Sequence, residues 1–153
     1  MEGLLEFKRF RIDDINILYN WANDPETRMN SFHSDKIVYD EHVKWCETRL
    51  DVDNIAIYIV YKNDIPVGQL RLEYVDKKAY ISYSVDKRYR GIGLGKKIIE
   101  SIEKNELYKG HHIIELIGEV KEDNLASQKV FEYCLYTKYS KNNRIVFVKR
   151  LIK

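Results

Sequence analysis

The segment from Arg88 to Lys97, RYRGIGLGKK, constrains the fold more than any other part of the chain. It follows a strictly alternating stretch, AYISYSV at 79–85, and runs into LGKKIIESIEKNEL at 94–107, where apolar residues recur at helical spacing. The chain therefore passes from a strand through a glycine-rich loop into a helix. The first amides of a helix lack intrahelical partners, and glycine lets a ligand approach the backbone. This pattern predicts a cradle for a diphosphate.

The spacing of the glycines excludes two familiar phosphate-binding loops. A dinucleotide-binding fingerprint starting at Gly91 requires a third glycine at position 96, which is Lys96. A P-loop requires a glycine where this chain has Arg90, and a Ser or Thr where it has Lys97. The three basic residues can instead reinforce a cradle built from backbone amides.

The remaining periodicities predict an α+β fold. Apolar residues alternate in the predicted strands and recur at helical spacing in the predicted helices, with Asp13 and Asn124 as N-caps and Pro25 ending the first helix. The predicted strands are 4–10, 55–62, 65–75, 79–85, 112–120, 136–140 and 144–152, and the predicted helices are 13–24, 40–50, 94–107 and 124–136. This order predicts a mixed, mostly antiparallel, twisted sheet of about seven strands flanked by about four helices, in a single domain spanning 1–153.

Composition excludes several classes of function. The formal net charge of +2 is too small to indicate binding to nucleic acid or to an anionic membrane surface. The four histidines have no metal-ligand spacing, so we expect no metal, and Cys46 and Cys134 suggest free thiols in a reducing compartment. No stretch is long and apolar enough to span a membrane, and the N-terminus lacks a signal-peptide pattern. We therefore expect a cytoplasmic protein.

VDKRYRGIGLGK at 85–96 resembles motif A, (Q/R)-x-x-G-x-(G/A), of the GCN5-related N-acetyltransferase (GNAT) family, with Arg90, Gly93 and Gly95 in the defining positions. EVKEDNLASQKVFE at 119–132 resembles the family's next strand and helix, where an Asn and a small residue face the cofactor. The order of elements also resembles that of the family along essentially the whole chain. The resemblance implies a GNAT fold, acetyl-CoA as the acetyl donor and usually a primary amine as the acceptor. The anion is then the pyrophosphate of coenzyme A.

The same resemblance assigns residues to the cofactor. It implies that the strand ending at Val85 splays from its neighbour, that pantetheine fills the gap, and that the Val85 amide polarises the thioester carbonyl. The residues expected to bind acetyl-CoA are Tyr83, Ser84, Val85, Arg90, Gly91, Ile92, Gly93, Leu94, Gly95, Lys96, Asn124 and Ser127.

Glu119 is the predicted general base. It ends a buried strand five residues before Asn124, the spacing of a catalytic glutamate in ribosomal-protein N-terminal acetyltransferases of this family. A carboxylate in a partly desolvated cleft suits this role, and a strand-end glutamate in a salt bridge is the alternative. The family's usual acid, a tyrosine seven residues after the Asn, is replaced by Phe131, and Leu135 stands where the family usually has a glycine. Either no side-chain acid is used, or it comes from elsewhere.

The segment WANDPETRMNSF at 21–32 points to the acceptor. With DEHVKW at 40–45 and PVGQLRLEY at 66–74, it resembles acetyltransferases of the pseudaminic acid and flagellin-glycosylation pathways, which acetylate the 4-amino group of a UDP-linked amino sugar. Such an acceptor needs aromatic stacking and a cation for its diphosphate. The expected acceptor residues are Trp21, Asn23, Arg28, Ser31, Phe32, His42, Trp45, Gln69 and Arg71. The alternatives are core tryptophans, surface arginines and a solvated His42.

We therefore expect an acetyl-CoA-dependent N-acetyltransferase, monomeric or homodimeric, that acts on a nucleotide-linked amino sugar by direct attack in a ternary complex. One alternative is an N-terminal acetyltransferase of a ribosomal protein or peptide. The other is a non-catalytic acetyl-CoA-binding module, which the phenylalanine at position 131 makes conceivable.

Overall fold

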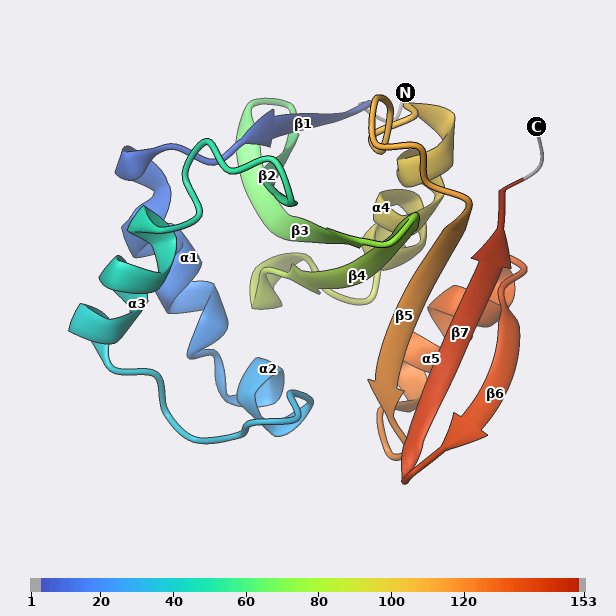
Figure 1. Cartoon of the computed structure of the whole chain (residues 1–153). Coiled ribbons are helices and arrows are strands. Elements are labelled where there is room, and N and C mark those ends of the chain that lie inside the picture. Colours follow the sequence, from blue (N-terminus) through green and yellow to red (C-terminus); the bar gives the residue numbers. More distant parts are fainter. Residues whose placement is uncertain (1–3, 152–153) are drawn as a thin grey trace.

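The computed structural model describes residues 4–151, which fold around one seven-stranded sheet (Figure 1). The strands lie in the order β1-β2-β3-β4-β5-β7-β6, and every neighbouring pair is antiparallel except the parallel pair β4 and β5. Their bounds are β1 Leu5–Arg9, β2 Ile55–Lys62, β3 Ile65–Val75, β4 Lys78–Val85, β5 Glu115–Lys121, β6 Thr137–Lys141 and β7 Arg144–Arg150. The predicted α+β class and the mixed, mostly antiparallel sheet are confirmed.

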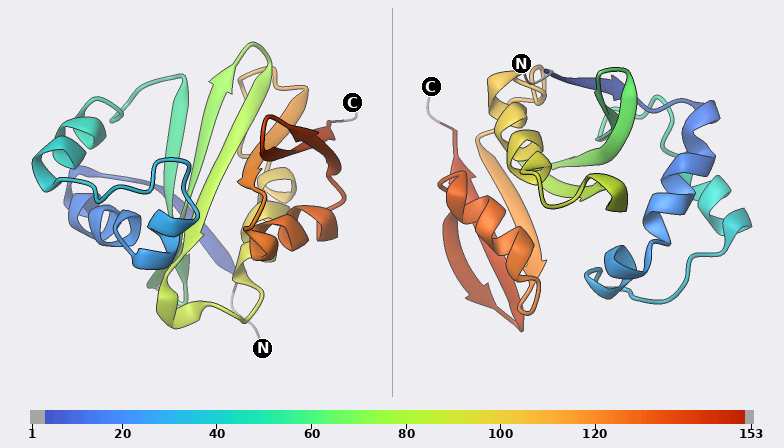
Figure 2. Two further views of the ribbon diagram at one scale, coloured as in Figure 1. Left: turned by 90° about the horizontal axis from the view of Figure 1, so that it is seen from below. Right: turned by 180° about the vertical axis from the view of Figure 1, so that it is seen from behind.

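The helices cover the two faces of the sheet separately, as Figure 2 shows. Helices α1 (Ile15–Ala22), α2 (Pro25–Met29) and α3 (Tyr39–Glu47) lie on one side, and α4 (Leu94–Lys104) and α5 (Leu125–Tyr133) lie on the other. Each side has its own apolar core. Alternating isoleucines of β2 pack against α1 and α3, while β3 and β4 pack against α4 and α5. No helix of the described chain is long and apolar enough to cross a bilayer.

The start of the chain's helical region differs from the prediction. Asp13 is not an N-cap, because it lies within a single 3-10 turn, Ile12–Asp14, and α1 begins after that turn. Pro25 follows α1 as predicted, but it also begins a second short helix, α2. The fixed φ angle and missing N–H of proline favour this first helical position, and Asp24 caps the helix by accepting from the Thr27 amide at 3.1 Å. The predicted cap Asn124 is confirmed, since its side chain accepts from the Ser127 amide at 3.2 Å.

The end of α5 takes the conformation that glycine usually supplies. Leu135 has a φ angle of 68°, and its amide donates to the Glu132 carbonyl at 3.1 Å. The amide of Tyr136 donates to the Phe131 carbonyl at 3.1 Å, which completes a Schellman motif. The helix thus ends at Tyr133, before the predicted end at 136. The other predicted elements differ only at their ends, and position 152 of the last predicted strand lies outside the described residues.

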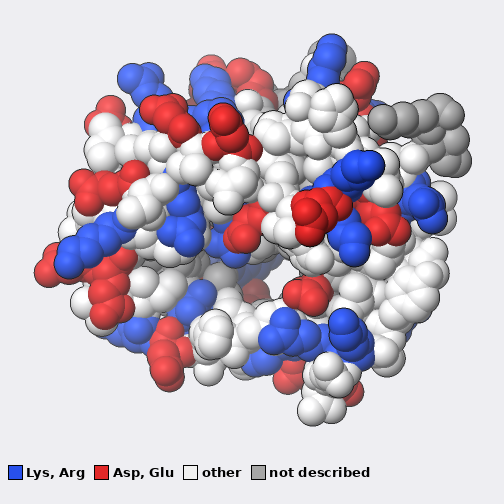
Figure 3. Space-filling model, in the orientation of Figure 1, with Lys and Arg blue, Asp and Glu red and all other residues white. Residues whose placement is uncertain are grey.

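The sheet splits between its two parallel strands. Strands β4 and β5 pair only from Lys78 with Glu115 to Ile81 with Gly118. Beyond this point β4 continues to pair with β3, and β5 continues to pair with β7. The two strands therefore diverge as the resemblance implied, and the molecular surface is hollowed at the same place (Figures 1 and 3). We call this split the fork.

Candidate active site

A cleft with a volume of about 1110 Å³ runs through the fork. On the α4 side it is lined by the glycine-rich loop and the start of α4, and on the other side by residues of α1, α2 and α3. The fork thereby joins the two faces of the sheet through one opening. Of the predicted site residues, all but Asn23 and Ile92 line this cleft.

The backbone of Val85 faces the fork. The Asp86 amide donates to the Val67 carbonyl at 2.8 Å, so Asp86 and Val67 form a hydrogen-bonded antiparallel pair. The next pair, Val85 with Gly68, is therefore a non-hydrogen-bonded pair, in which the backbone N–H and C=O groups of each residue point away from the partner strand. The amide and carbonyl of Val85 are thus directed toward the side from which β5 has separated. This is the geometry that a backbone donor for a substrate oxygen requires.

The glycine-rich loop leaves the first amides of α4 accessible. Gly93 is the N-cap of α4 with a φ angle of 84°, and as a glycine it has no side chain to accept from those amides. The first intrahelical bond we observe runs from the Lys97 amide to the Gly93 carbonyl at 3.3 Å. A Cβ added at Gly91 or Gly93 would meet no atom within 4 Å, so both face open space. The loop therefore suits the close approach of a diphosphate to backbone N–H groups.

A tyrosine hydroxyl lies inside the fork on the α5 side. The hydroxyl of Tyr83 lies 3.0 Å from Ser127 Oγ, and its ring meets Phe131 edge to face at 6.2 Å between centroids. Burial raises the pKa of Tyr83 to about 12, so the hydroxyl stays protonated near neutral pH. Gly95 allows this packing, because a Cβ there would lie 3.3 Å from the tyrosine ring. The ring of Phe131 packs directly beneath Gly118 of β5 and carries no polar atom.

The predicted base lies at the opposite edge of the fork. The Glu119 carboxylate is 3.4 Å from Arg144 Nη1 on β7, and the Arg144 guanidinium lies over the Phe32 ring at 3.9 Å. The Glu119 side chain is 38% exposed and lines the cleft, so the carboxylate is only partly desolvated. Its side chain alternates with Val120, which packs in the core beneath α4 and α5, so Glu119 lies on the opposite face of β5. Solvent access leaves a water-mediated proton transfer open to it.

Polar side chains of β3 and β4 line one face of the cleft. Gln69 Nε2 donates to Ser84 Oγ at 3.2 Å. Arg71 Nε lies 3.3 Å from the Glu73 carboxylate, and its guanidinium lies 5.3 Å from the Trp45 ring centre. Burial lowers the pKa of the Arg71 guanidinium, although a group with this intrinsic basicity remains a cation. The arrangement presents a cation and an aromatic ring side by side.

Arg28 and Asn23 hold the loop that follows α2. Arg28 donates to the carbonyls of Ala22, His33 and Asp35 and to the Ser31 hydroxyl. The Asn23 side chain accepts from the amide of Ile37 and donates to its carbonyl, at 2.7 and 2.9 Å. All three guanidinium nitrogens of Arg28 therefore already have partners within the protein, which the sequence did not reveal.

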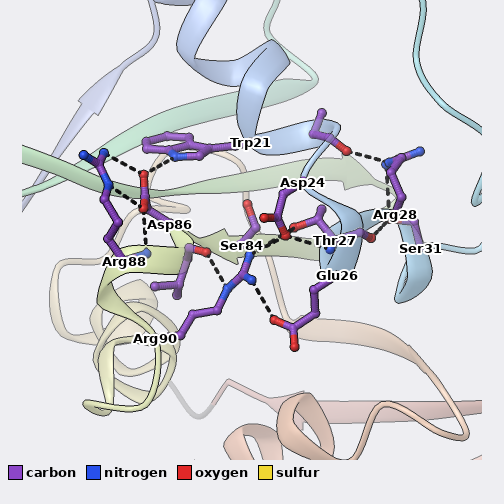
Figure 4. A network of polar contacts seen from close by, with 12 residues as sticks. Trp21, Asp24, Glu26, Thr27, Arg28, Ser31, Ser84, Asp86, Arg88 and Arg90 are labelled. Atoms are coloured by element: carbon purple, nitrogen blue, oxygen red, sulfur yellow. Dashed lines mark hydrogen bonds and ion pairs between the residues drawn. The ribbon is translucent and has the colours of Figure 1, made fainter.

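Trp21 and His42 are both buried. The indole N–H of Trp21 donates to Asp86 Oδ2 at 2.9 Å (Figure 4). His42 Nε2 lies 3.4 Å from Cys46 Sγ, and burial lowers the pKa of the histidine, which favours the neutral ring. Both residues line the cleft, and a role in binding the acceptor stays a prediction.

Several lining residues escaped the sequence reasoning. The polar ones are Glu26, Thr27, His33, Glu41, Glu73, Tyr80, Ser82 and Tyr89. Three of them had a usable signal, because Tyr80 and Ser82 alternate with Ser84 on β4, and Glu73 alternates with Arg71 on β3. No cluster of metal-ligating side chains occurs within residues 4–151.

A sheet that splits beside a glycine-rich helix start defines the class of CoA-dependent acyltransferases. Residues 15–134 match the model of the acetyltransferase (GNAT) family, and the chain belongs to that family. It is 23% identical over 138 residues to an uncharacterized N-acetyltransferase, YfmK, of Bacillus subtilis (strain 168). The aligned region covers 90% of this chain and 88% of YfmK.

Solved structures share the fold at low sequence identity. The ribosomal L7/L12 α-N-protein acetyltransferase RimL in complex with coenzyme A matches with a TM-score of 0.82 and 14% identity, covering 97% of this chain and 94% of RimL. The enzyme AAC(6')-Ib in complex with ribostamycin and coenzyme A matches with a TM-score of 0.83 and 14% identity, covering 96% and 93%. The protein is thus an acetyl-CoA-dependent N-acetyltransferase with a GNAT fold.

Proposed function

We propose that this protein transfers the acetyl group of acetyl-CoA to an amino sugar, and that the acceptor is the 4-amino group of a UDP-linked sugar. The observation that carries the proposal is the single cleft through the fork, which joins an anion cradle at the start of α4 to a polar face on β3 and β4. Two substrates held in one cleft can react by direct attack, because binding supplies their proximity and orientation.

The polar face suits a sugar that carries an anionic group. Gln69, Ser82 and Ser84 line the cleft with amide and hydroxyl groups that can bond sugar hydroxyls. Arg71 is the better candidate for a diphosphate than Arg28, because the nitrogens of Arg28 are already bonded within the loop. Trp45, beside Arg71, offers a ring for stacking. The solved structure of AAC(6')-Ib contains ribostamycin, and an aminoglycoside is built from amino sugars.

The chain's own residues divide the chemical work as follows. Acetyl-CoA supplies an activated thioester. Glu119 takes the proton of the attacking amine, directly or through water, while the Val85 amide donates to the carbonyl oxygen as negative charge develops there. Tyr83 offers a protonated hydroxyl inside the fork to the departing sulfur. Since a thiolate is already a good leaving group, this donor assists the reaction and is not essential to it.

Two other functions remain as alternatives. The fold shared with RimL and the position of Glu119 favour an N-terminal acetyltransferase of a protein or peptide. Phe131 and the ion pair between Glu119 and Arg144 favour a non-catalytic module that binds acetyl-CoA. The polar face on β3 and β4 argues for the sugar acceptor over both.

A thiol-release assay with acetyl-CoA tests the proposal. The acceptors are UDP-linked 4-amino sugars, free amino sugars, aminoglycosides, peptides with free N-termini and polyamines, each beside its N-acetylated form as a matched control. Turnover that is highest on the UDP-linked sugar supports the proposal. Turnover only on peptides replaces it with the first alternative, and CoA binding without turnover on any acceptor replaces it with the second.

A further inference from the structure

Arg90, a defining residue of the glycine-rich motif, points toward α2, where Asp24 and Glu26 lie (Figure 4). Its Nη2 lies 2.8 Å from Asp24 Oδ2, its Nη1 lies 2.7 Å from Glu26 Oε2, and its Nε donates to the Val85 carbonyl at 3.0 Å. Each of its three nitrogens therefore has a protein partner. The guanidinium bridges the end of β4 and the start of α2, and the bonded residues Arg90 and Asp24 are 66 positions apart in the sequence.

Asp24 is a well-fixed anchor for this bridge. Its side chain is only 11% exposed, and it also accepts from the amide and hydroxyl of Thr27 as the N-cap of α2. Burial opposes its ionisation, but the hydrogen bonds from Arg90 and Thr27 outweigh burial and hold the pKa of Asp24 below its usual value. A partly buried charge pair of this kind is sensitive to the loss of either partner.

A second contact ties the same two regions together. The indole N–H of Trp21, near the end of α1, donates to Asp86, which directly follows β4. Helix α2 leads into the loop that Arg28 organises and that places Phe32 against Arg144. The position of the acceptor-side loop therefore depends on how α2 is attached to the end of β4.

We infer that Arg90 is a positioning residue that holds α2 and the loop at 30–37 against the cofactor cradle, and is not a ligand of the pyrophosphate. Its bond to the Val85 carbonyl also fixes the peptide next to the proposed oxyanion donor. Loss of Arg90 then misplaces the acceptor relative to the thioester, while the amides of α4 still bind the diphosphate. This inference rests on the proposed amine acetylation for its kinetic consequences only.

The test compares Arg90→Gln with Asp24→Asn. Asparagine is as good an N-cap as aspartate, so the second variant removes the ion pair and leaves the cap of α2 in place. In both variants we expect kcat/KM for the amine to fall about tenfold or more, and the CoA Kd from calorimetry to stay within about threefold. The double variant should be no worse than Arg90→Gln alone, because the contact between Arg90 and Asp24 is already lost in that variant. Lys87→Gln, which removes an exposed positive charge from the same loop, is the matched control.

A tenfold or larger rise in the CoA Kd of Arg90→Gln with kcat/KM intact in Asp24→Asn would overturn the inference. Hydrogen exchange of the α2 and loop amides in the CoA-bound protein supplies a readout independent of turnover. We expect faster exchange at 25–37 in both variants than in Lys87→Gln, and unchanged exchange there also overturns the inference. Failure of the wild-type protein to acetylate any amine would count against the proposed function alone.

Discussion

The guanidinium of Arg144 lies between the Glu119 carboxylate, at 3.4 Å, and the ring of Phe32, at 3.9 Å from the ring centre. This contact joins β5 and β7 to the loop that follows α2. Lys121 adds a second connection at the same edge, since its Nζ donates to the Met29 carbonyl at 2.8 Å. The predicted base therefore lies where the loop that follows α2 meets the sheet.

Glu119→Gln is expected to lower kcat by about 100-fold or more, because an amide cannot accept the proton of the attacking amine. The CoA Kd should not change, since the cradle is formed by the loop after β4 and the start of α4, and Glu119 is on β5. The matched control is Glu122→Gln, an exposed glutamate in the turn after β5. A kcat for Glu119→Gln within twofold of the wild-type value removes Glu119 from the mechanism.

Gly93→Val is expected to raise the CoA Kd by at least about tenfold, or 1.4 kcal/mol, because a side chain at the N-cap of α4 blocks backbone approach. Gly110→Val is the control for backbone strain, because Gly110 has a similar φ angle of 92° but lies in another turn. Calorimetry should show that only the first variant loses affinity. Normal affinity in Gly93→Val would show that the cradle is elsewhere.

Tyr83→Phe is expected to lower kcat about tenfold and to leave the CoA Kd nearly unchanged, because it removes only the hydroxyl that faces the fork. The pKa of about 12 means that Tyr83 stays protonated below that pH, so the loss should be the same at every working pH. Tyr139→Phe, an exposed position on β6, is the control. An unchanged kcat would show that the thiolate departs without a proton from the Tyr83 hydroxyl.

Leu135→Gly is expected to stabilise the fold by about 1 kcal/mol, because glycine adopts the left-handed C-cap without the strain that Leu135 bears at a φ angle of 68°. Urea unfolding should show a higher midpoint. Lys129→Gly, at an exposed position in the interior of α5, should instead destabilise the fold by about 1 kcal/mol. A lower midpoint for Leu135→Gly would mean that the leucine side chain makes a stabilising contact.

Asp86 should contribute to acid sensitivity. Hydrogen bonds from Arg88, reinforced by Trp21, hold the pKa of Asp86 well below the unfolded value of 3.8, despite its burial. A group whose pKa is lowered on folding stabilises the fold above its unfolded pKa, and this contribution disappears as pH falls through the folded pKa. Asp86→Asn should therefore be less stable than wild type near neutral pH, and the difference should shrink below pH 3.8. Urea unfolding monitored by tryptophan fluorescence at several pH values measures this, and a constant difference would contradict it.

The sequence predicted local features well. The passage from β4 through three glycines into α4, the cap formed by Asn124 and the alternation of the strands all depend on neighbouring residues. Helix α2 was missed because Pro25 reads equally as the end of one helix or the start of the next. The prediction of Asp13 as an N-cap failed for a similar reason, since the aspartates at 13 and 14 both offer a capping side chain.

The sequence by itself determined the order of strands and helices and the glycine-rich start of α4, because both follow from short-range periodicity and glycine spacing. The family followed from the motif that this loop resembles, and the family model matches residues 15–134. Only the tertiary structure decided what each long side chain contacts. Arg90 meets Asp24 across 66 positions, Arg144 meets Glu119 across 25, and Tyr83 meets Ser127 across 44. Such partners depend on where the chain returns in space, and a flexible side chain can reach any of several groups of suitable charge. The type of residue therefore indicates what chemistry it can do, and the fold decides which residues do it.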